Sequence, residues 1–92
     1  MKQYIKKKGE NTMRLEYKNE TENAFKFWEV KIEAKKKLIV KYGRIGIKNP
    51  ATKTFIFPTT NPKEGFKTKE DAEKYREKKI KEKISKGYVE IN

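Results

Sequence analysis

The strongest structural signal in the chain is Phe25-Lys26-Phe27-Trp28-Glu29-Val30-Lys31-Ile32-Glu33-Ala34. Apolar side chains occupy every second position from Trp28 to Ala34, and charged side chains fill the positions between them. This is the period of a strand with one buried face, so residues 25–34 are predicted to form a long strand. Trp28 falls on the apolar face and is expected in the core.

The same alternation resumes from Leu38 to Tyr42, after the charged turn 35–37. The two segments are predicted to form an antiparallel hairpin. Gly43 and Gly46 follow the second strand and are expected to be structural turn residues, at a bulge or a sharp bend. Residues 53–57 contain Thr54, Ile56 and two Phe, all residue types common in strands, and are predicted to form another strand that ends at Pro58.

The segments before residue 25 and after residue 57 complete the predicted order of strands and helix. Residues 13–18 alternate and predict a first strand, whereas residues 1–12 are expected to form a mobile basic arm. Thr68 has the features of a helix N-cap, and Gly87 those of a helix stop. Residues 88–91 alternate again, as a short strand or a docked tail. The sequence therefore predicts an α+β domain over residues 13–92: a small antiparallel sheet of about four or five strands with one C-terminal helix packed on one face.

The face of the helix that meets the sheet is mixed in character. Its apolar members are Ala72, Tyr75, Ile80 and Ile84. Three basic residues lie between them and are expected to lay their aliphatic stems on the core while keeping their charges in water. These three are Arg76, Lys79 and Lys83.

Charge is distributed unevenly along the 92 residues, which carry a formal net charge of +12. No acidic residue lies between Glu33 and Glu64, and this window contains eight basic ones. Because most basic residues are Lys, the total charge says little about a partner. The clustering says more, and it predicts a basic patch suited to a polyanion.

Catalysis and metal binding have little support in the composition. The chain contains neither Cys nor His, which excludes thiolate and imidazole metal ligands and an imidazole base. No phosphate-binding Gly-rich loop and no nucleophile motif is present. We therefore expect no enzyme activity, no cofactor and no metal. With no secretory signal and no apolar run of membrane-spanning length, we also expect a cytoplasmic protein, not secreted and without a membrane partner.

The chain resembles the WGR domain, a family named after a Trp-Gly-Arg triplet. The matching triplet here is Tyr42-Gly43-Arg44, followed by Ile45-Gly46. Lys26-Phe27-Trp28-Glu29 resembles the family's Lys-Phe-Tyr strand, and residues 83–88 resemble its closing Lys-x-x-Lys-Gly-Tyr. The resemblance covers about residues 15–88. It departs from the family at Tyr42, which replaces Trp, and at Ile47-Lys48-Asn49, where another Gly is common.

The resemblance implies a small antiparallel sheet with one helix and an activity in nucleic-acid binding near a DNA end or break. Such domains occur in poly(ADP-ribose) polymerases and as bacterial modules, some of which stand alone, so a bacterial cytosol is the expected setting. In the family the aromatic residue packs on a terminal sugar or base, and basic groups meet phosphate. In the polymerases the same face also docks neighbouring domains.

These features single out six candidate nucleic-acid-binding residues. Tyr42 is either a core or rim residue or a ring exposed for stacking on a sugar or base. Arg44 is either a phosphate contact or a partner in an intramolecular salt bridge. Lys41, Lys48 and Lys53 either extend a positive track along the sheet edge or are ordinary surface lysines. Lys83 is carried over from the family motif.

We therefore expect a non-catalytic nucleic-acid-binding module that is monomeric and takes DNA rather than RNA, with a preference for ends and nicks. The alternative is a protein-interaction or regulatory module that docks an acidic partner through the same basic face. A ribosomal-type RNA binder would fit the charge but not the order of the motifs.

Overall fold

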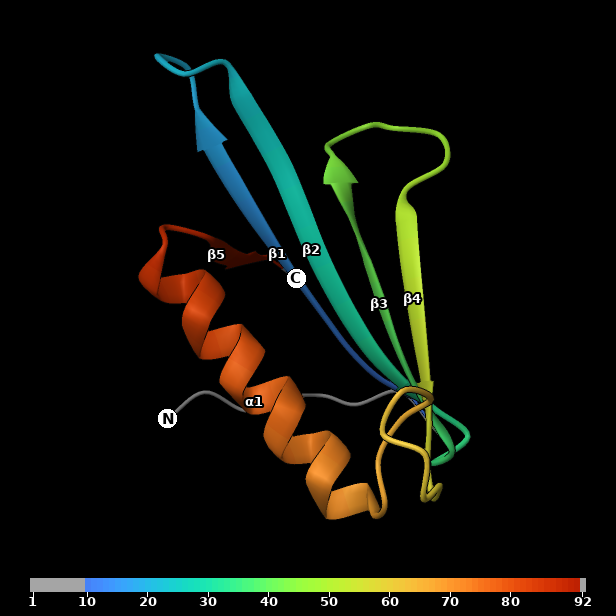
Figure 1. The fold of residues 1–92 in the computed structure, drawn as a ribbon. Helices are drawn as coiled ribbons and strands as arrows, with labels where there is room; N and C mark the ends of the chain where they lie inside the picture. Colours follow the sequence, from blue (N-terminus) through green and yellow to red (C-terminus); the bar gives the residue numbers. More distant parts are fainter. Residues whose placement is uncertain (1–9, 92) are drawn as a thin grey trace.

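The computed structural model describes residues 10–91, which form five strands and one helix (Figure 1). The elements are β1 (Glu10–Asn19), β2 (Ala24–Glu33), β3 (Lys37–Arg44), β4 (Ala51–Ile56), α1 (Lys69–Ser85) and β5 (Val89–Ile91). The strands lie in the order β4-β3-β2-β1-β5, and each neighbouring pair is antiparallel. The predicted α+β class is confirmed, and the terminal segment, predicted as a short strand or a docked tail, contributes the strand Val89–Ile91.

The first strand is longer than the sequence predicted. It begins at Glu10 rather than at Met13, because residues 10–12 continue the pairing with the end of β2. The expected mobile arm was 1–12, and its residues 1–9 lie outside the described part of the chain.

The β2–β3 hairpin is confirmed, with a tight turn between its strands. Ala34 and Lys35 have φ angles of 53° and 56°, and the Lys36 N–H donates to the Glu33 carbonyl at 3.0 Å. Two successive positive φ values are typical of the turn that matches the twist of a hairpin. The turn therefore lies one residue earlier than the predicted 35–37, and Lys37 already belongs to β3.

Gly43 is not the break in the strand that the sequence predicted. It stays in the ladder of β3, paired with Phe27, and Arg44 continues the strand opposite Lys26. The sharp turn follows at residues 44–47, where the Ile47 N–H donates to the Arg44 carbonyl at 3.0 Å. Gly46 has a φ of 90° in the third position of this turn, which favours glycine. The prediction is thus correct for Gly46 and wrong for Gly43.

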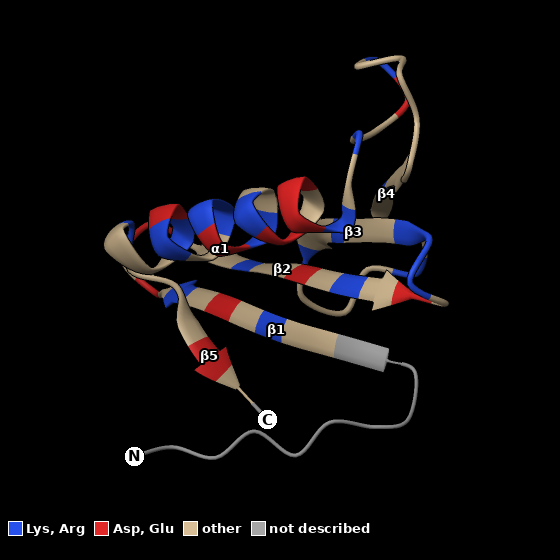
Figure 2. Cartoon of the chain, turned by 90° about the horizontal axis from the view of Figure 1, so that it is seen from below, with Lys and Arg blue, Asp and Glu red and all other residues tan. Residues whose placement is uncertain are grey.

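Helix α1 lies across one face of the sheet and forms the core with it (Figure 2). Leu15, Val30 and Leu38 are completely buried there, and Trp28 is a core residue as predicted. Among the helical side chains, Ala72 and Ile80 are buried, whereas Ile84 is 50% exposed, against the prediction. At 3.6 residues per turn, Ile84 lies about 120° around the helix from Ala72, at the margin of the buried face.

Both helix ends have the predicted caps. The Thr68 hydroxyl accepts a hydrogen bond from the Asp71 N–H at 3.0 Å. At the other end, the Gly87 N–H donates to the Ile84 carbonyl at 3.0 Å and the Tyr88 N–H to the Lys83 carbonyl at 3.1 Å. This pair of bonds is a Schellman motif, which directs the chain from the last helical turn into β5. Within residues 10–91, no helix combines the length and the apolar character needed to cross a membrane.

Candidate nucleic-acid interface

A row of polar side chains crosses the sheet just beyond the end of the core. Tyr17 on β1 pairs with Lys26 on β2, and Lys26 pairs with Arg44 on β3. Directly opposed residues share a face of the sheet, with Cβ atoms about 4.5–5.5 Å apart. The next row along these strands contains Trp28, which is buried under α1. Lys26 and Arg44 therefore lie on the helix-covered face, at the place where that cover ends.

The end of the helix supplies the other wall of this region. The Schellman motif brings Lys83 and Tyr88 together, with the Lys83 ammonium 5.1 Å from the centre of the Tyr88 ring. The Tyr88 ring lies 5.5 Å from that of Tyr17, and the Lys26 ammonium lies 5.4 Å from the Tyr17 ring. A Cβ atom at position 87 would lie only 3.1 Å from the Tyr17 ring. Glycine at this position therefore allows the backbone after the helix to pass close to Tyr17.

Several of these side chains line an open pocket of about 470 Å³. Its lining contains three cationic side chains, two phenol rings and no carboxylate. The lining residues are Asn23, Ala24, Lys26, Phe27, Tyr42, Gly43, Arg44, Lys83 and Tyr88. The structure thus brings three of the six predicted residues, Tyr42, Arg44 and Lys83, into one pocket.

Arg44 is exposed and weakly held. Its Nη1 donates to the Asn23 carbonyl at 3.4 Å and its Nη2 to the Asn23 side-chain oxygen at 3.5 Å. Its Cζ lies 5.5 Å from the centre of the Phe25 ring. No carboxylate in residues 12–91 forms a salt bridge with it. Since a guanidinium has five N–H donors, Arg44 retains donors for an incoming phosphate.

Tyr42 combines both roles that the sequence allowed. It pairs with Trp28 and lies on the core-facing side of β3. It is nevertheless 37% exposed to solvent. Lys53 lies on the same face, because it pairs with Val40, and its ammonium is 6.0 Å from the centre of the Tyr42 ring. Lys53 therefore extends the positive charge of the pocket toward β4.

The remaining predicted lysines are not in the pocket. Lys41 lies on the opposite face of the sheet, paired with Glu29 on one side and Thr52 on the other. Lys48 is exposed in the loop between β3 and β4. Of the two alternatives stated for these lysines, a continuous track does not form, because alternation along β3 puts Lys41 on the far face. Lys41 and Lys48 lie at ordinary exposed surface positions.

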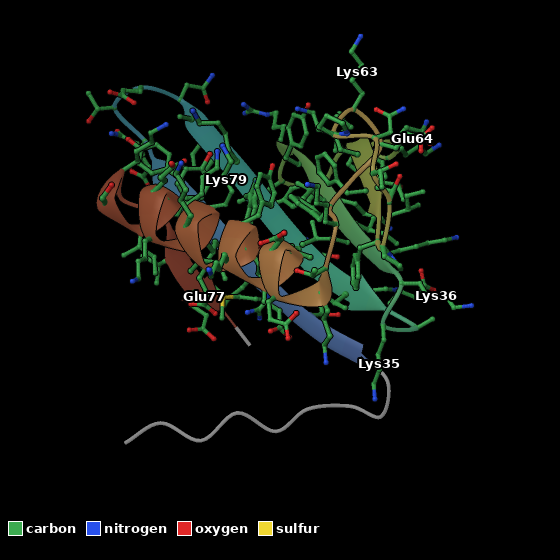
Figure 3. The ribbon with its side chains drawn as sticks, turned by 60° about the horizontal axis from the view of Figure 1, so that its bottom comes forward. Lys35, Lys36, Lys63, Glu64, Glu77 and Lys79 are labelled. Carbon is green, nitrogen blue, oxygen red and sulfur yellow. The ribbon has the colours of Figure 1, made fainter. Side chains whose placement is uncertain are left out.

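The acid-free window does not form one surface either. Lys35 and Lys36 project from the β2–β3 turn, and Lys63 projects from a separate loop (Figure 3). The three side chains are exposed and point into solvent in different directions. Clustering of charge along the sequence thus overstated its clustering in space.

The Lys83 ammonium lies near other cations. Burial lowers the pKa of Lys83 from its ordinary value of 10.5, and the nearby ammonium groups of Lys86, Lys79 and Lys26 lower it further. Glu82 opposes this shift only in part. An anion bound in the pocket would relieve the repulsion among these cations, which is the electrostatic property expected of an anion-binding site.

Sequence reasoning missed Lys26, Tyr17 and Tyr88 as site residues. A signal for Lys26 was present, since the alternation that buries Trp28 also puts Lys26 on the helix-covered face, where a cation is unusual. Tyr88 is the last residue of the Lys-x-x-Lys-Gly-Tyr motif at 83–88, from which Lys83 was selected as a candidate. Tyr17 carries no such signal, because only the pairing of β1 with β2 places it beside Lys26.

The described residues offer no set of metal ligands. Across residues 10–91, no group of three or more acidic side chains is arranged to hold a metal ion. The pocket instead offers hydrogen-bond donors, positive charge and ring faces. These three properties together suit a phosphate joined to a sugar or a base.

Comparison with known proteins agrees with this chemistry. A family model described as the WGR domain matches residues 11–92. No curated protein and no solved structure matches the chain. WGR domains are generally nucleic-acid-binding modules. The matched segment covers the whole described fold apart from Glu10, including all the pocket residues, and so the chain belongs to the WGR domain family.

Proposed function

We propose that the chain is a non-catalytic module that binds DNA at ends or nicks, as a monomer, through the pocket between the sheet end and the last turn of α1. The observation that carries the proposal is the lining of this pocket, in which Lys26, Arg44 and Lys83 meet two phenol rings and no carboxylate. Membership of the WGR family supports the general class of ligand.

Each group in the pocket has a task in this proposal. Arg44 and Lys26 lie opposite each other across two strands and would donate to the same phosphate from two directions. Tyr42 presents an exposed ring at the rim and would stack on the terminal sugar or base, which is worth about 1–3 kcal/mol. Lys83 approaches from the helix side and would complete the phosphate site.

The size of the pocket supports the proposed preference for interrupted strands. A pocket of about 470 Å³ falls in the size range of sites for small ligands, about 300–1,000 Å³. A strand end can insert its last nucleotide into such a pocket without breaking stacking on both sides. An internal nucleotide of a closed duplex would first have to be unstacked, which costs a few kcal/mol.

Salt dependence provides a quantitative expectation. Three cations line the pocket and Lys53 lies next to it, giving four groups that can neutralise phosphate. At about 0.9 counterions released per phosphate, log K should fall with log salt at a slope of about −3 to −4. The value is modest for a chain with a formal net charge of +12, because most of its lysines lie outside the pocket.

The test compares one DNA circle in closed, singly nicked and linear forms, each titrated at several salt concentrations. The proposal expects tighter binding to the nicked and linear forms, with the stated slope. Equal, salt-insensitive binding to the three forms would refute it. Capture of a protein from nuclease-treated extract, with no DNA retained beforehand, would instead favour the acidic-partner alternative.

A further inference from the structure

Lys83 combines two properties that its role as a phosphate contact does not require. Its amine is partly buried in the pocket, held over the Tyr88 ring at 5.1 Å, and surrounded by other ammonium groups. Burial and these neighbours lower its pKa, so the neutral amine is more abundant than in an exposed lysine at the same pH. The neutral amine is the nucleophilic form of lysine.

The pocket that Lys83 lines has two further cationic side chains, Lys26 and Arg44. Lys26 and Arg44 pair directly across β2 and β3 and face the pocket together. No carboxylate in the lining competes for them. A small molecule that carries a phosphoryl group would be concentrated there, close to the Lys83 amine.

We propose that Lys83 is a covalent modification site for small acyl phosphates, whose phosphoryl group is held by Lys26 and Arg44 while the acyl group is transferred to the Lys83 amine. The nitrogen lone pair attacks the acyl carbon and forms an amide bond. The bond from that carbon to the phosphate oxygen breaks, its electrons leave with the phosphate, and one nitrogen proton passes to water. No oxidant, reductant or metal is needed.

Acylation would switch off the binding site. It removes one of the three pocket cations and adds an uncharged group where phosphate would sit. The expected effect is a loss of DNA affinity of about tenfold or more, with a salt slope smaller by about 0.9. This second half of the proposal rests on the proposed function, whereas the acyl transfer itself does not.

The experiment incubates the full chain with acetyl phosphate and follows acetylation of each lysine by mass spectrometry. Lys78 is the internal reference, because it is exposed on the same helix and does not line the pocket. We expect Lys83 to be acetylated several-fold faster than Lys78. Inorganic phosphate should slow the reaction at Lys83 and leave Lys78 unchanged. Equal rates at the two lysines, or equal slowing by phosphate, would overturn the proposal.

Two further measurements distinguish binding of the phosphoryl group by Lys26 and Arg44 from a Lys83 amine that is simply more nucleophilic than other lysines. Acetic anhydride has no phosphoryl group, so the ratio of the Lys83 and Lys78 rates should be lower with it than with acetyl phosphate. Arg44→Gln should lower this ratio for acetyl phosphate only, and circular dichroism would verify that the variant is folded. A ratio that is the same for both reagents and unaffected by Arg44→Gln would contradict the proposed binding of the phosphoryl group by Lys26 and Arg44. None of these readouts involves DNA, so failure of DNA binding would be recognised separately.

Discussion

Replacing Arg44 by glutamine tests the role of the pocket in binding, because the change removes a charge and leaves the fold nearly untouched. The Arg44 side chain is exposed, its two hydrogen bonds to Asn23 are 3.4 and 3.5 Å long, and its ring contact with Phe25 is at 5.5 Å. Contacts this weak contribute less than about 1 kcal/mol. The midpoint of urea unfolding should therefore remain close to that of the parent chain.

The effect on binding should be much larger. A hydrogen-bonded contact to a charged group is worth about 1.5–3 kcal/mol, which corresponds to a loss of affinity of about 10- to 150-fold. One fewer phosphate contact also lowers the salt slope by about 0.9. Fluorescence anisotropy with a labelled nicked duplex, titrated at four or more salt concentrations, measures both quantities in one series.

Lys78→Gln is the matched control for this experiment. It removes the same charge from an exposed site on α1 that does not line the pocket. If the two variants lose the same affinity and the same fraction of the salt slope, binding depends only on net charge. That result would refute the assignment of Arg44 to a specific phosphate contact.

Three other predictions follow from the same structure. Tyr42→Ala should weaken binding to nicked DNA by about 1–3 kcal/mol in an anisotropy titration, whereas Tyr42→Phe retains the ring and should bind nearly as the parent does; equal losses would exclude stacking. The folded-state pKa of Lys83 is lowered from 10.5, so the unfolded chain binds more protons in the window between the two values, and stability should rise as the pH increases through this window. Urea midpoints should show this rise in the parent and less of it in Lys83→Met; an identical pH profile in both would contradict the assignment. Leu15→Ala, at a completely buried position, should cost about 2–5 kcal/mol in urea unfolding, against about 0.5 kcal/mol or less for Val89→Ala, which is 63% exposed.

The fold could be predicted from the sequence because its signals are local. Alternation in residues 25–34 and 38–42 specified a hairpin, and Thr68 and Gly87 marked the helix ends. Each of these depends on a few neighbouring residues. The errors also have local causes: Gly43 has the residue type of a bulge, but the ladder with Phe27 keeps it in the strand.

The site was harder to predict because it depends on register and on where the helix ends. Tyr42, Arg44 and Lys83 were identified and do share a pocket, two through the triplet and one through the closing motif. Lys41 was placed with them by proximity in sequence, yet alternation turns it to the other face, opposite Glu29. Lys26 was passed over because its charge alone looked unremarkable among so many lysines.

An amide chemical-shift titration of the chain with a nicked DNA duplex tests the central claim most directly. The pocket is predicted to be the binding interface, so the largest shifts should fall on Lys26, Gly43, Arg44 and Tyr88. Amides of residues whose side chains lie on the opposite face, such as Thr52, should move little. Shifts concentrated on that opposite face, or spread evenly over the exposed lysines with the pocket unmoved, would contradict the account.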